Sequence, residues 1–163
     1  TRNFFGTMKI KILAVGSKMP AWVADGVKEY FKRFPREIKI EIVEIPLGNR
    51  AKNADTQRAI KQECDQLLSY VDKSDHVIAL EVKGRDWSTE KLAENMKTWK
   101  MNGLNVALLV GGPDGLNEDC RRRANQQWSL SALTLRHPIV RVILAGQLYR
   151  AWPVTQNQHY PRA

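Results

Sequence analysis

The chain has 163 residues, of which 43% are hydrophobic and 26% charged, a composition typical of a globular protein. Its 26 Lys and Arg residues outnumber 17 Asp and Glu residues, and the formal net charge of +9 favours a polyanionic partner. Nucleic acid is preferred over a membrane surface, because no strongly amphipathic basic helix is visible. No apolar run approaches the roughly 18 residues of a membrane span, and the two cysteines, Cys64 and Cys120, predict free thiols in a reducing compartment such as the cytoplasm.

The first half of the chain predicts alternating strands and helices. Residues 1–7 are expected to be a vector remnant, which leaves 8–163 as a single domain. Residues 9–16 are rich in β-formers and end in glycine, which predicts a strand. Helical spacing over 20–33, with a proline in the first turn, predicts a helix. Alternation over 37–46 predicts a half-buried strand.

The pattern continues through the middle of the chain. Asn53 or Asp55 could cap a second helix. Residues 76–82 predict a third strand, and Ser88-Thr-Glu90 opens a third helix. The continuous apolar run 105–110 is typical of a parallel strand buried on both faces. Four strand–helix alternations predict an α/β fold, a mainly parallel sheet flanked by helices on both faces.

The segment 47–55 is a polar loop that carries two cations, Arg50 and Lys52. In a basic protein these cations could contact nucleic-acid phosphates. The alternative is an ordinary solvated loop, and the sequence leaves both interpretations open.

A glycine-rich segment, Gly111-Gly112-Pro113-Asp114-Gly115, directly follows the strand predicted over 105–110. Ligands of open α/β sheets bind beyond the carboxyl ends of the strands, and glycines there allow close approach to the backbone. The spacing matches neither the dinucleotide-binding fingerprint nor the phosphate loop, and a nucleotide hydrolase is set aside because the phosphate-loop lysine and metal-binding carboxylates are missing. A plain tight turn remains the alternative.

Residues 126–135 are apolar but include Ser129, Ser131 and Thr134. Hydroxyl side chains favour turns and local bonds to the backbone, so this segment predicts a pocket lined by backbone rather than a core strand. A helix follows from Pro138. Its apolar stripe is typical of a core or of a dimer face and consists of Val140, Ile143, Leu144, Leu148 and Trp152.

Taken together, these segments resemble the RlmH family of SPOUT enzymes, which methylate N3 of a pseudouridine in 23S ribosomal RNA. The resemblance rests mainly on the stretches 111–115, 128–135, 137–138, 141–144 and 148–152. It extends upstream through Val15-Gly16, Tyr30, Arg33-Phe34, Lys52-Asn53-Ala54 and Leu80, and covers nearly all of residues 8–162.

The resemblance implies a SPOUT fold whose C-terminal segment forms a trefoil knot. It also implies S-adenosyl-L-methionine as cofactor, a homodimer that uses the stripe of helix 138–152, and ribosomal RNA on assembled ribosomes as substrate, with no metal and no membrane. The residues implied to line the cofactor pocket are Leu80, Gly111, Leu130, Ser131, Ala132, Leu133, Thr134 and Leu135, with Gly112 and Gly115 shaping it.

For the chemistry we hypothesise that Arg150, Tyr160 and Arg162 contact the acceptor base, with His159 as a candidate general base. His137 is interpreted as a structural or hinge residue.

Two positions depart from the family pattern: Gly146 stands in place of a glutamate, and Pro161 in place of a histidine in the tail. Two alternatives stay open, a SPOUT methyltransferase acting on another RNA such as tRNA, and a non-catalytic RNA-binding or ribosome-assembly protein.

Overall fold

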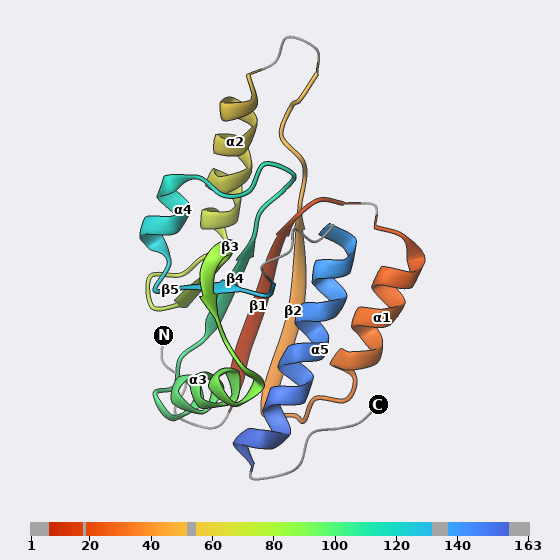
Figure 1. Cartoon of the computed structure of the whole chain (residues 1–163), viewed down its shortest axis with the longest axis vertical. Coiled ribbons are helices and arrows are strands. Elements are labelled where there is room, and N and C mark those ends of the chain that lie inside the picture. Colours follow the sequence, from red (N-terminus) through yellow and green to blue (C-terminus); the bar gives the residue numbers. More distant parts are fainter. Residues whose placement is uncertain (1–6, 18, 52–54, 132–136, 157–163) are drawn as a thin grey trace.

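The structure is a computed structural model, which describes residues 7–17, 19–51, 55–131 and 137–156 (Figure 1). Strands and helices alternate along these residues. In chain order the elements are β1 (Met8–Val15), α1 (Ala21–Phe31), β2 (Ile38–Ile45), α2 (Thr56–Ser69), β3 (His76–Asp86), α3 (Thr89–Met101), β4 (Val106–Val110), α4 (Glu118–Arg123), β5 (Gln126–Ser129) and α5 (His137–Thr155).

The strands form one sheet in the order β2-β1-β4-β3-β5, and every pairing is parallel. Parallel strands have their carboxyl ends on the same side of the sheet, and β1, β2 and β4 run upward in Figure 1. This arrangement confirms the predicted α/β fold with a parallel sheet.

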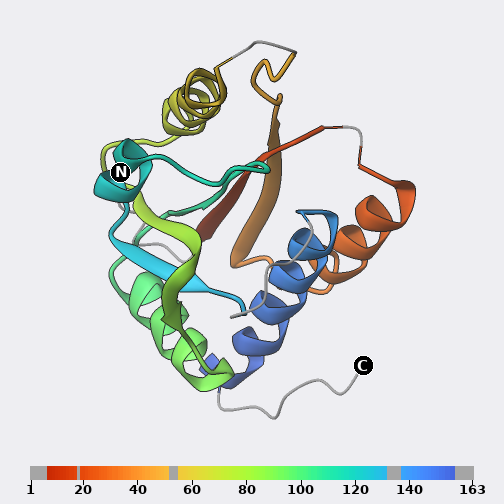
Figure 2. The same cartoon turned by 45° about the horizontal axis from the view of Figure 1, so that its top comes forward.

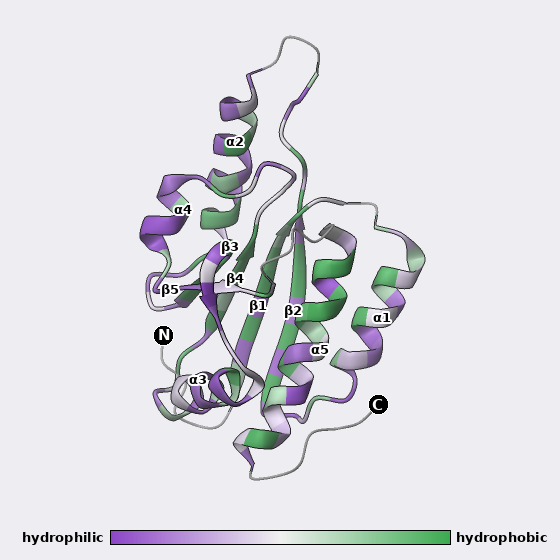
Figure 3. Ribbon diagram, in the orientation of Figure 1, coloured by the Kyte–Doolittle hydropathy of each residue, from purple (hydrophilic) through white to green (hydrophobic). Residues whose placement is uncertain are grey.

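Each face of the sheet carries a buried core. Along β1, Ile10 and Ile12 belong to a core that also contains side chains of α3 and α5. Leu13 and Val15 belong to a second core with side chains of α2 and α4. Successive side chains of a strand point to opposite faces, so an uninterrupted apolar run is needed when both faces are covered. Figure 3 shows mostly hydrophobic residues along β1, β2 and β4, and helices that carry both hydrophobic and hydrophilic residues.

Side-chain caps define where α2 and α3 begin. The Asp55 carboxylate accepts a hydrogen bond from the Gln57 N–H at 2.9 Å, so Asp55 is the cap of α2. The Ser88 hydroxyl accepts from the Lys91 N–H at 3.0 Å and starts α3, as predicted. Each cap satisfies an amide of the first turn that has no partner within the helix.

The strand β5 is a departure from the sequence prediction, which placed a pocket segment rather than a strand at residues 126–129. β5 pairs with β3, and the Trp128 side chain is buried and stacks on Trp87 with ring centroids 4.9 Å apart. The Ser129 hydroxyl donates to the Ser131 carbonyl oxygen at 2.9 Å. This local bond satisfies the buried hydroxyl, so Ser129 does not prevent a strand.

The apolar stripe of α5 is another correction. Leu144, Leu148 and Trp152 are buried within this chain, in the core shared with α3. Figure 2 shows α5 lying on the sheet beside α1. These three side chains are therefore core residues, the first of the two alternatives that the sequence left open, and they are not available for a dimer face.

The two cysteines are free and buried, in agreement with the sequence analysis. They nevertheless lie next to each other, because the Cys120 Sγ is 3.9 Å from the Cys64 carbonyl oxygen. The Asn117 N–H donates to the Cys64 Sγ at 3.3 Å. Hydrogen bonding, chiefly from the Cys120 thiol, lowers the pKa of Cys64, while burial opposes it. The pair joins α2 to α4.

None of the helices in the described part of the chain is long and apolar enough to cross a membrane. Within the same residues, no group of three or more His, Cys, Asp and Glu side chains is arranged to hold a metal ion.

Candidate functional site

The described cofactor residues predicted from the sequence lie on or directly after three neighbouring strands, β3, β4 and β5. In the sheet β3 lies between β4 and β5, with Ala79 opposite Leu109 and Leu80 opposite Trp128. Leu80 lies within β3, Gly111 follows β4 and Leu130 follows β5, so the strand register places these three residues toward the same edge of the sheet. The described residues of the predicted pocket are Leu80, Gly111, Gly112, Gly115, Leu130 and Ser131.

The glycine loop, residues 111–115, is folded as a tight turn. The Gly115 N–H donates to the Gly112 carbonyl oxygen at 3.0 Å, which closes the turn around Pro113 and Asp114. Gly115 has φ +78°, a conformation that other residues rarely adopt. The loop is thus both the plain turn and the exposed backbone segment that the sequence left as alternatives, because its glycines are only half-buried.

The neighbouring wall of the site is apolar. Trp128 pairs with both Leu80 and Arg85, so residues 81–84 bulge out of the β3–β5 ladder. Leu80 and Leu130 are half-buried and pack on the core that contains Trp128. Half-buried apolar side chains next to accessible backbone suit a ligand with an aromatic ring and several polar groups. The described residues therefore fit an adenosine-containing cofactor.

Several predicted site residues lie outside the described residues. In the cofactor segment these are Ala132, Leu133, Thr134 and Leu135. In the tail these are His159, Tyr160 and Arg162, together with Pro161. The trefoil knot of the C-terminal segment stays a prediction, because residues 132–136 and 157–163 of that segment lie outside the described residues.

Arg141 fixes the start of α5, directly after residues 132–136. Its guanidinium donates to the Gly16 carbonyl oxygen and to the Glu44 carboxylate, both at 2.7 Å. Only 3% of the Arg141 surface is exposed, and its buried Nε has no hydrogen-bond partner in the described part of the chain. Arg141 thus anchors α5 to the carboxyl ends of β1 and β2. Sequence reasoning gave it no role.

Arg150 lies toward the opposite end of α5. It is exposed, and nine residues of helix separate it from Arg141, a distance of about 13 Å along the axis. Trp152, two residues further, lines a cavity together with Met8 at the start of β1. Arg150 is therefore near the amino edge of the sheet, and a single chain does not bring it to the glycine loop.

That cavity, of about 290 Å³, contains none of the predicted site residues. Besides Met8 and Trp152 it is lined by the end of α3, including Lys97 and Lys100. The Lys100 ammonium lies 4.9 Å from the centre of the Trp152 ring. Surface lysines beside one aromatic ring do not identify a ligand, so the cavity carries no assignment.

Arg50 is paired within the chain, whereas the sequence left open a phosphate contact or an ordinary solvated loop. Its guanidinium pairs with Glu63 on α2 and with Asp114 in the glycine loop, which disfavours a phosphate contact. Lys52, the other cation of that loop, lies outside the described residues. The partner Glu63 was missed, although it stands beside Cys64 on the buried face of α2. An acidic residue at a core position is the signal that could have found it.

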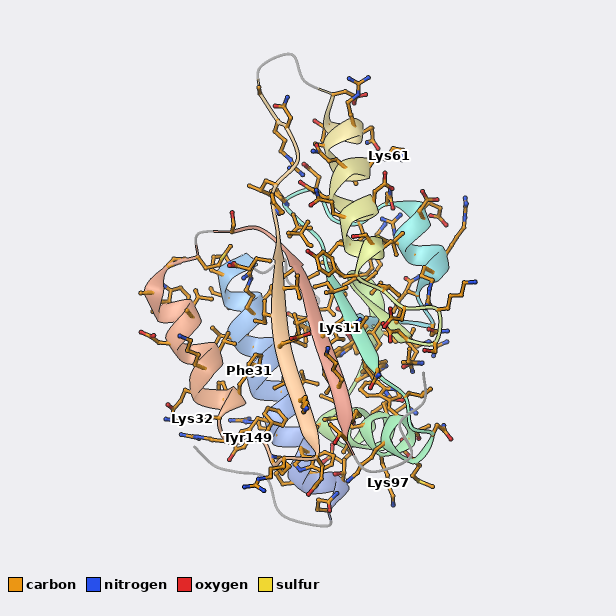
Figure 4. All side chains as sticks on the ribbon, turned by 180° about the vertical axis from the view of Figure 1, so that it is seen from behind. Lys11, Phe31, Lys32, Lys61, Lys97 and Tyr149 are labelled. Atoms are coloured by element: carbon orange, nitrogen blue, oxygen red, sulfur yellow. The ribbon has the colours of Figure 1, made fainter. Side chains whose placement is uncertain are left out.

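Gly146, one of the two departures from the family pattern, has a packing role. A Cβ at this position would lie 3.2 Å from the Cζ of Tyr30, so α1 and α5 approach closely here. The Tyr30 and Tyr149 rings are 5.8 Å apart. Figure 4 labels Tyr149 and, on α1, Phe31 at this end of the helix pair. The ring of Tyr30 thus occupies space beside the position where relatives are expected to have glutamate.

Comparison with known proteins identifies relatives over almost the whole chain. The family described as "Predicted SPOUT methyltransferase" matches residues 8–161. The ribosomal RNA large subunit methyltransferase H of Hahella chejuensis (strain KCTC 2396) is 56% identical over 155 residues, covering 95% of this chain and 99% of that protein. The protein of the same name from Marinomonas sp. (strain MWYL1) is 53% identical over 155 residues, covering 95% and 100%.

Two solved structures share the fold at low sequence identity. A probable methylase family protein from Haemophilus influenzae Rd KW20 has a TM-score of 0.56 and 14% identity, covering 96% of this chain and 72% of that one. The tRNA (m1G37) methyltransferase from Aquifex aeolicus has a TM-score of 0.55 and 14% identity, covering 96% and 75%.

Proposed function

The chain belongs to the SPOUT methyltransferase family, and from this premise we propose that it methylates N3 of a pseudouridine in 23S ribosomal RNA. One observation carries the proposal: the chain is 56% identical to a ribosomal RNA large subunit methyltransferase H across 99% of that relative's length. The chain is an enzyme, a methyltransferase that uses S-adenosyl-L-methionine.

S-adenosyl-L-methionine supplies, when bound, a methyl group activated by the adjoining sulfonium. The chain's own residues hold it at the carboxyl edge of the sheet. Leu80 and Leu130 provide half-buried apolar surface, and the turn at Gly112 and Gly115 leaves backbone groups accessible for hydrogen bonds. Ala132, Leu133, Thr134 and Leu135 complete this pocket in the proposal. Positioning of this kind supplies much of the acceleration of an in-line displacement.

The acceptor nitrogen must lose a proton, because N3 of a uracil-type ring is protonated near neutral pH. Arg150, Tyr160 and Arg162 are proposed to stabilise the resulting anion on the flanking carbonyl oxygens. His159 is the candidate base that takes the proton.

The position of Arg150 requires a second subunit. Arg150 and the glycine loop lie toward opposite edges of the sheet in one chain, so we propose a homodimer in which Arg150 of one subunit completes the cofactor site of the other. Trp22 and Ile139, 55% and 42% exposed, stand at the starts of α1 and α5 and offer apolar surface for the contact. They replace the buried stripe of α5 as the proposed dimer face.

The charge of the chain fits an RNA partner. A formal net charge of +9 attracts phosphates over the whole surface. We propose assembled ribosomes as the substrate, which places the enzyme in the cytoplasm.

The proposal is tested with labelled S-adenosyl-L-methionine and ribosomes from a strain that lacks the activity. Label at N3 of a pseudouridine in 23S ribosomal RNA is the expected result. Label found only in tRNA would contradict the proposal that 23S ribosomal RNA is the acceptor. An absence of label, together with no saturable heat on titration with S-adenosyl-L-methionine, would instead identify a non-catalytic RNA-binding protein.

The shared site has its own test. An Arg150→Ala chain is mixed with a chain that cannot bind the cofactor, and the subunits are exchanged. Mixed dimers should regain activity, because one of their two sites has both an intact pocket and an intact Arg150. Failure to regain activity in dimers shown to be mixed would contradict a site shared between subunits.

A further inference from the structure

We propose that Arg50 is a positioning residue for the cofactor, holding the glycine loop (111–115) against a buried carboxylate on α2. This inference rests on the proposed use of S-adenosyl-L-methionine at that loop. It concerns a contact network on the side of the loop opposite to the pocket, formed by Arg50, Glu63 and Asp114.

Glu63 is the buried carboxylate to which the other residues of the network bind. Its side chain is 1% exposed, although charged residues are rarely buried unless they are paired. One carboxylate oxygen accepts the Gly48 N–H at 2.8 Å as well as an Arg50 N–H, and the other accepts a second Arg50 N–H at 3.0 Å. Both oxygens are therefore satisfied, and Glu63 is held on the buried face of α2, near the middle of the helix.

The glycine loop rests directly on this carboxylate. A Cβ added to Gly112 would lie 3.1 Å from Glu63 Oε1 and 2.9 Å from Val15 Cγ1. The backbone of the loop thus passes so close to Glu63 that only a residue without a side chain fits. The position of the loop depends on where Glu63 and its partner are held.

Arg50 supplies the direct link to the loop. Its Nε donates to Asp114 Oδ2 at 2.9 Å, while its two terminal nitrogens point to Glu63. A planar guanidinium can bind one carboxylate with two N–H groups and still offer a third, which an ammonium group cannot do in the same geometry. The two carboxylates, Glu63 foremost, raise the pKa of Arg50, so its charge is permanent.

The sheet order places this link on the side away from the pocket. Arg50 follows β2, and the glycine loop follows β4, so the side chain spans the end of β1 between them. Leu80 lies on β3 and Leu130 follows β5, on the other side of β4. Arg50 therefore acts on the cofactor through the loop and not by contact.

The test uses two variants that break the link at different points. Asp114→Ala removes only the carboxylate of the glycine loop that binds Arg50. The Asp114 side chain is 41% exposed, so folding should be preserved. Arg50→Lys keeps a charge for Glu63 but cannot hold both carboxylates. The matched control is Asp119→Ala, another exposed acid, which pairs with Arg122 on α4 at 3.8 Å.

Both variants should bind S-adenosyl-L-methionine about tenfold more weakly by calorimetry, the size expected for one charge-assisted hydrogen bond. The KM for the cofactor should rise with little change in kcat, and Asp119→Ala should match the unmodified protein. A purely structural contact would lower the melting temperature and leave the affinity of the folded protein unchanged. Unchanged affinity in Asp114→Ala would overturn the inference, whatever happens to Arg50→Lys.

The double variant provides a second measurement. If Arg50 and Asp114 act through one contact, their effects on cofactor affinity should not add. Additive effects would contradict a shared role. The unmodified protein separates this inference from the proposed function, since failure of the unmodified protein to bind S-adenosyl-L-methionine would remove both, whereas tight binding by every variant would remove only the role of Arg50.

Discussion

The guanidinium of Arg141 donates to the carbonyl oxygen of Gly16 at 2.7 Å, although the two residues are 125 positions apart in the chain. The bond joins the start of α5 to the end of β1. Its second partner, Glu44, is the only carboxylate that the described residues place against this buried cation. An ion pair and a hydrogen bond of Arg141 thus hold the start of α5 on the sheet, in addition to the apolar packing of this helix.

This pairing predicts an asymmetric loss of stability. Glu44→Ala leaves a buried guanidinium without its counter-charge and should cost about 2–3 kcal/mol, less than for a fully buried pair because Glu44 is 43% exposed. Arg141→Met removes the charge itself and should cost about 1–2 kcal/mol, mainly the lost hydrogen bond to Gly16. Urea unfolding of both variants measures the difference. A larger loss in Arg141→Met would show that the Gly16 bond dominates.

The glycine loop allows a separate test of backbone strain. Gly115 has φ +78°, and a Cβ there would meet no atom within 4 Å. Gly115→Ala should therefore cost about 1–2 kcal/mol from backbone conformation alone, and Gly115→Asn should cost less because asparagine tolerates this region. Thermal unfolding compares the two. Equal losses would mean that side-chain contacts, not φ, determine the effect.

The local features of the fold were predictable from the sequence. The apolar run of β4 and the caps at Asp55 and Ser88 depend on residues close together in the chain. The strand β5 was not predictable from the sequence. The burial of its Trp128 depends on Trp87, which lies 41 positions earlier and stacks on Trp128 only when β3 and β5 pair. Periodicity over ten residues contains no information about such a partner.

The candidate site divides in the same way. The glycine loop was recognised because glycine after a parallel strand has a direct physical meaning. The role of Arg50 was not recognised, since its partner Asp114 is 64 positions away, and the sequence left both a phosphate contact and an ordinary solvated loop open. Arg141 was overlooked for the same reason, because a single arginine among apolar helix residues does not reveal which strand ends it joins.

The charge of the chain predicts how substrate and cofactor binding respond to salt. Binding of RNA should weaken steeply, by about 10³-fold between 50 and 200 mM salt if six phosphates are contacted. Binding of S-adenosyl-L-methionine should change little, because a small ligand has no condensed counterions to release. Filter binding with ribosomal RNA and calorimetry with the cofactor, in the same buffers, measure both. Equal salt dependence would contradict the view that the net charge of +9 serves the RNA.

The exposed position of Arg150 gives the most direct test of the proposed chemistry. Arg150→Ala should leave the melting temperature unchanged, since the side chain is exposed on α5. The affinity for S-adenosyl-L-methionine should be nearly intact, because Arg150 is distant from the glycine loop of its own chain. Methyl transfer to ribosomal RNA should fall about 10²–10³-fold, the usual effect of losing one group that stabilises a developing anion. Arg122→Ala, at an arginine that is 72% exposed on α4, is the matched control and should transfer methyl groups normally. If Arg150→Ala retained full turnover, the anion would have to be stabilised by other groups, and the homodimer would no longer be needed to explain the site.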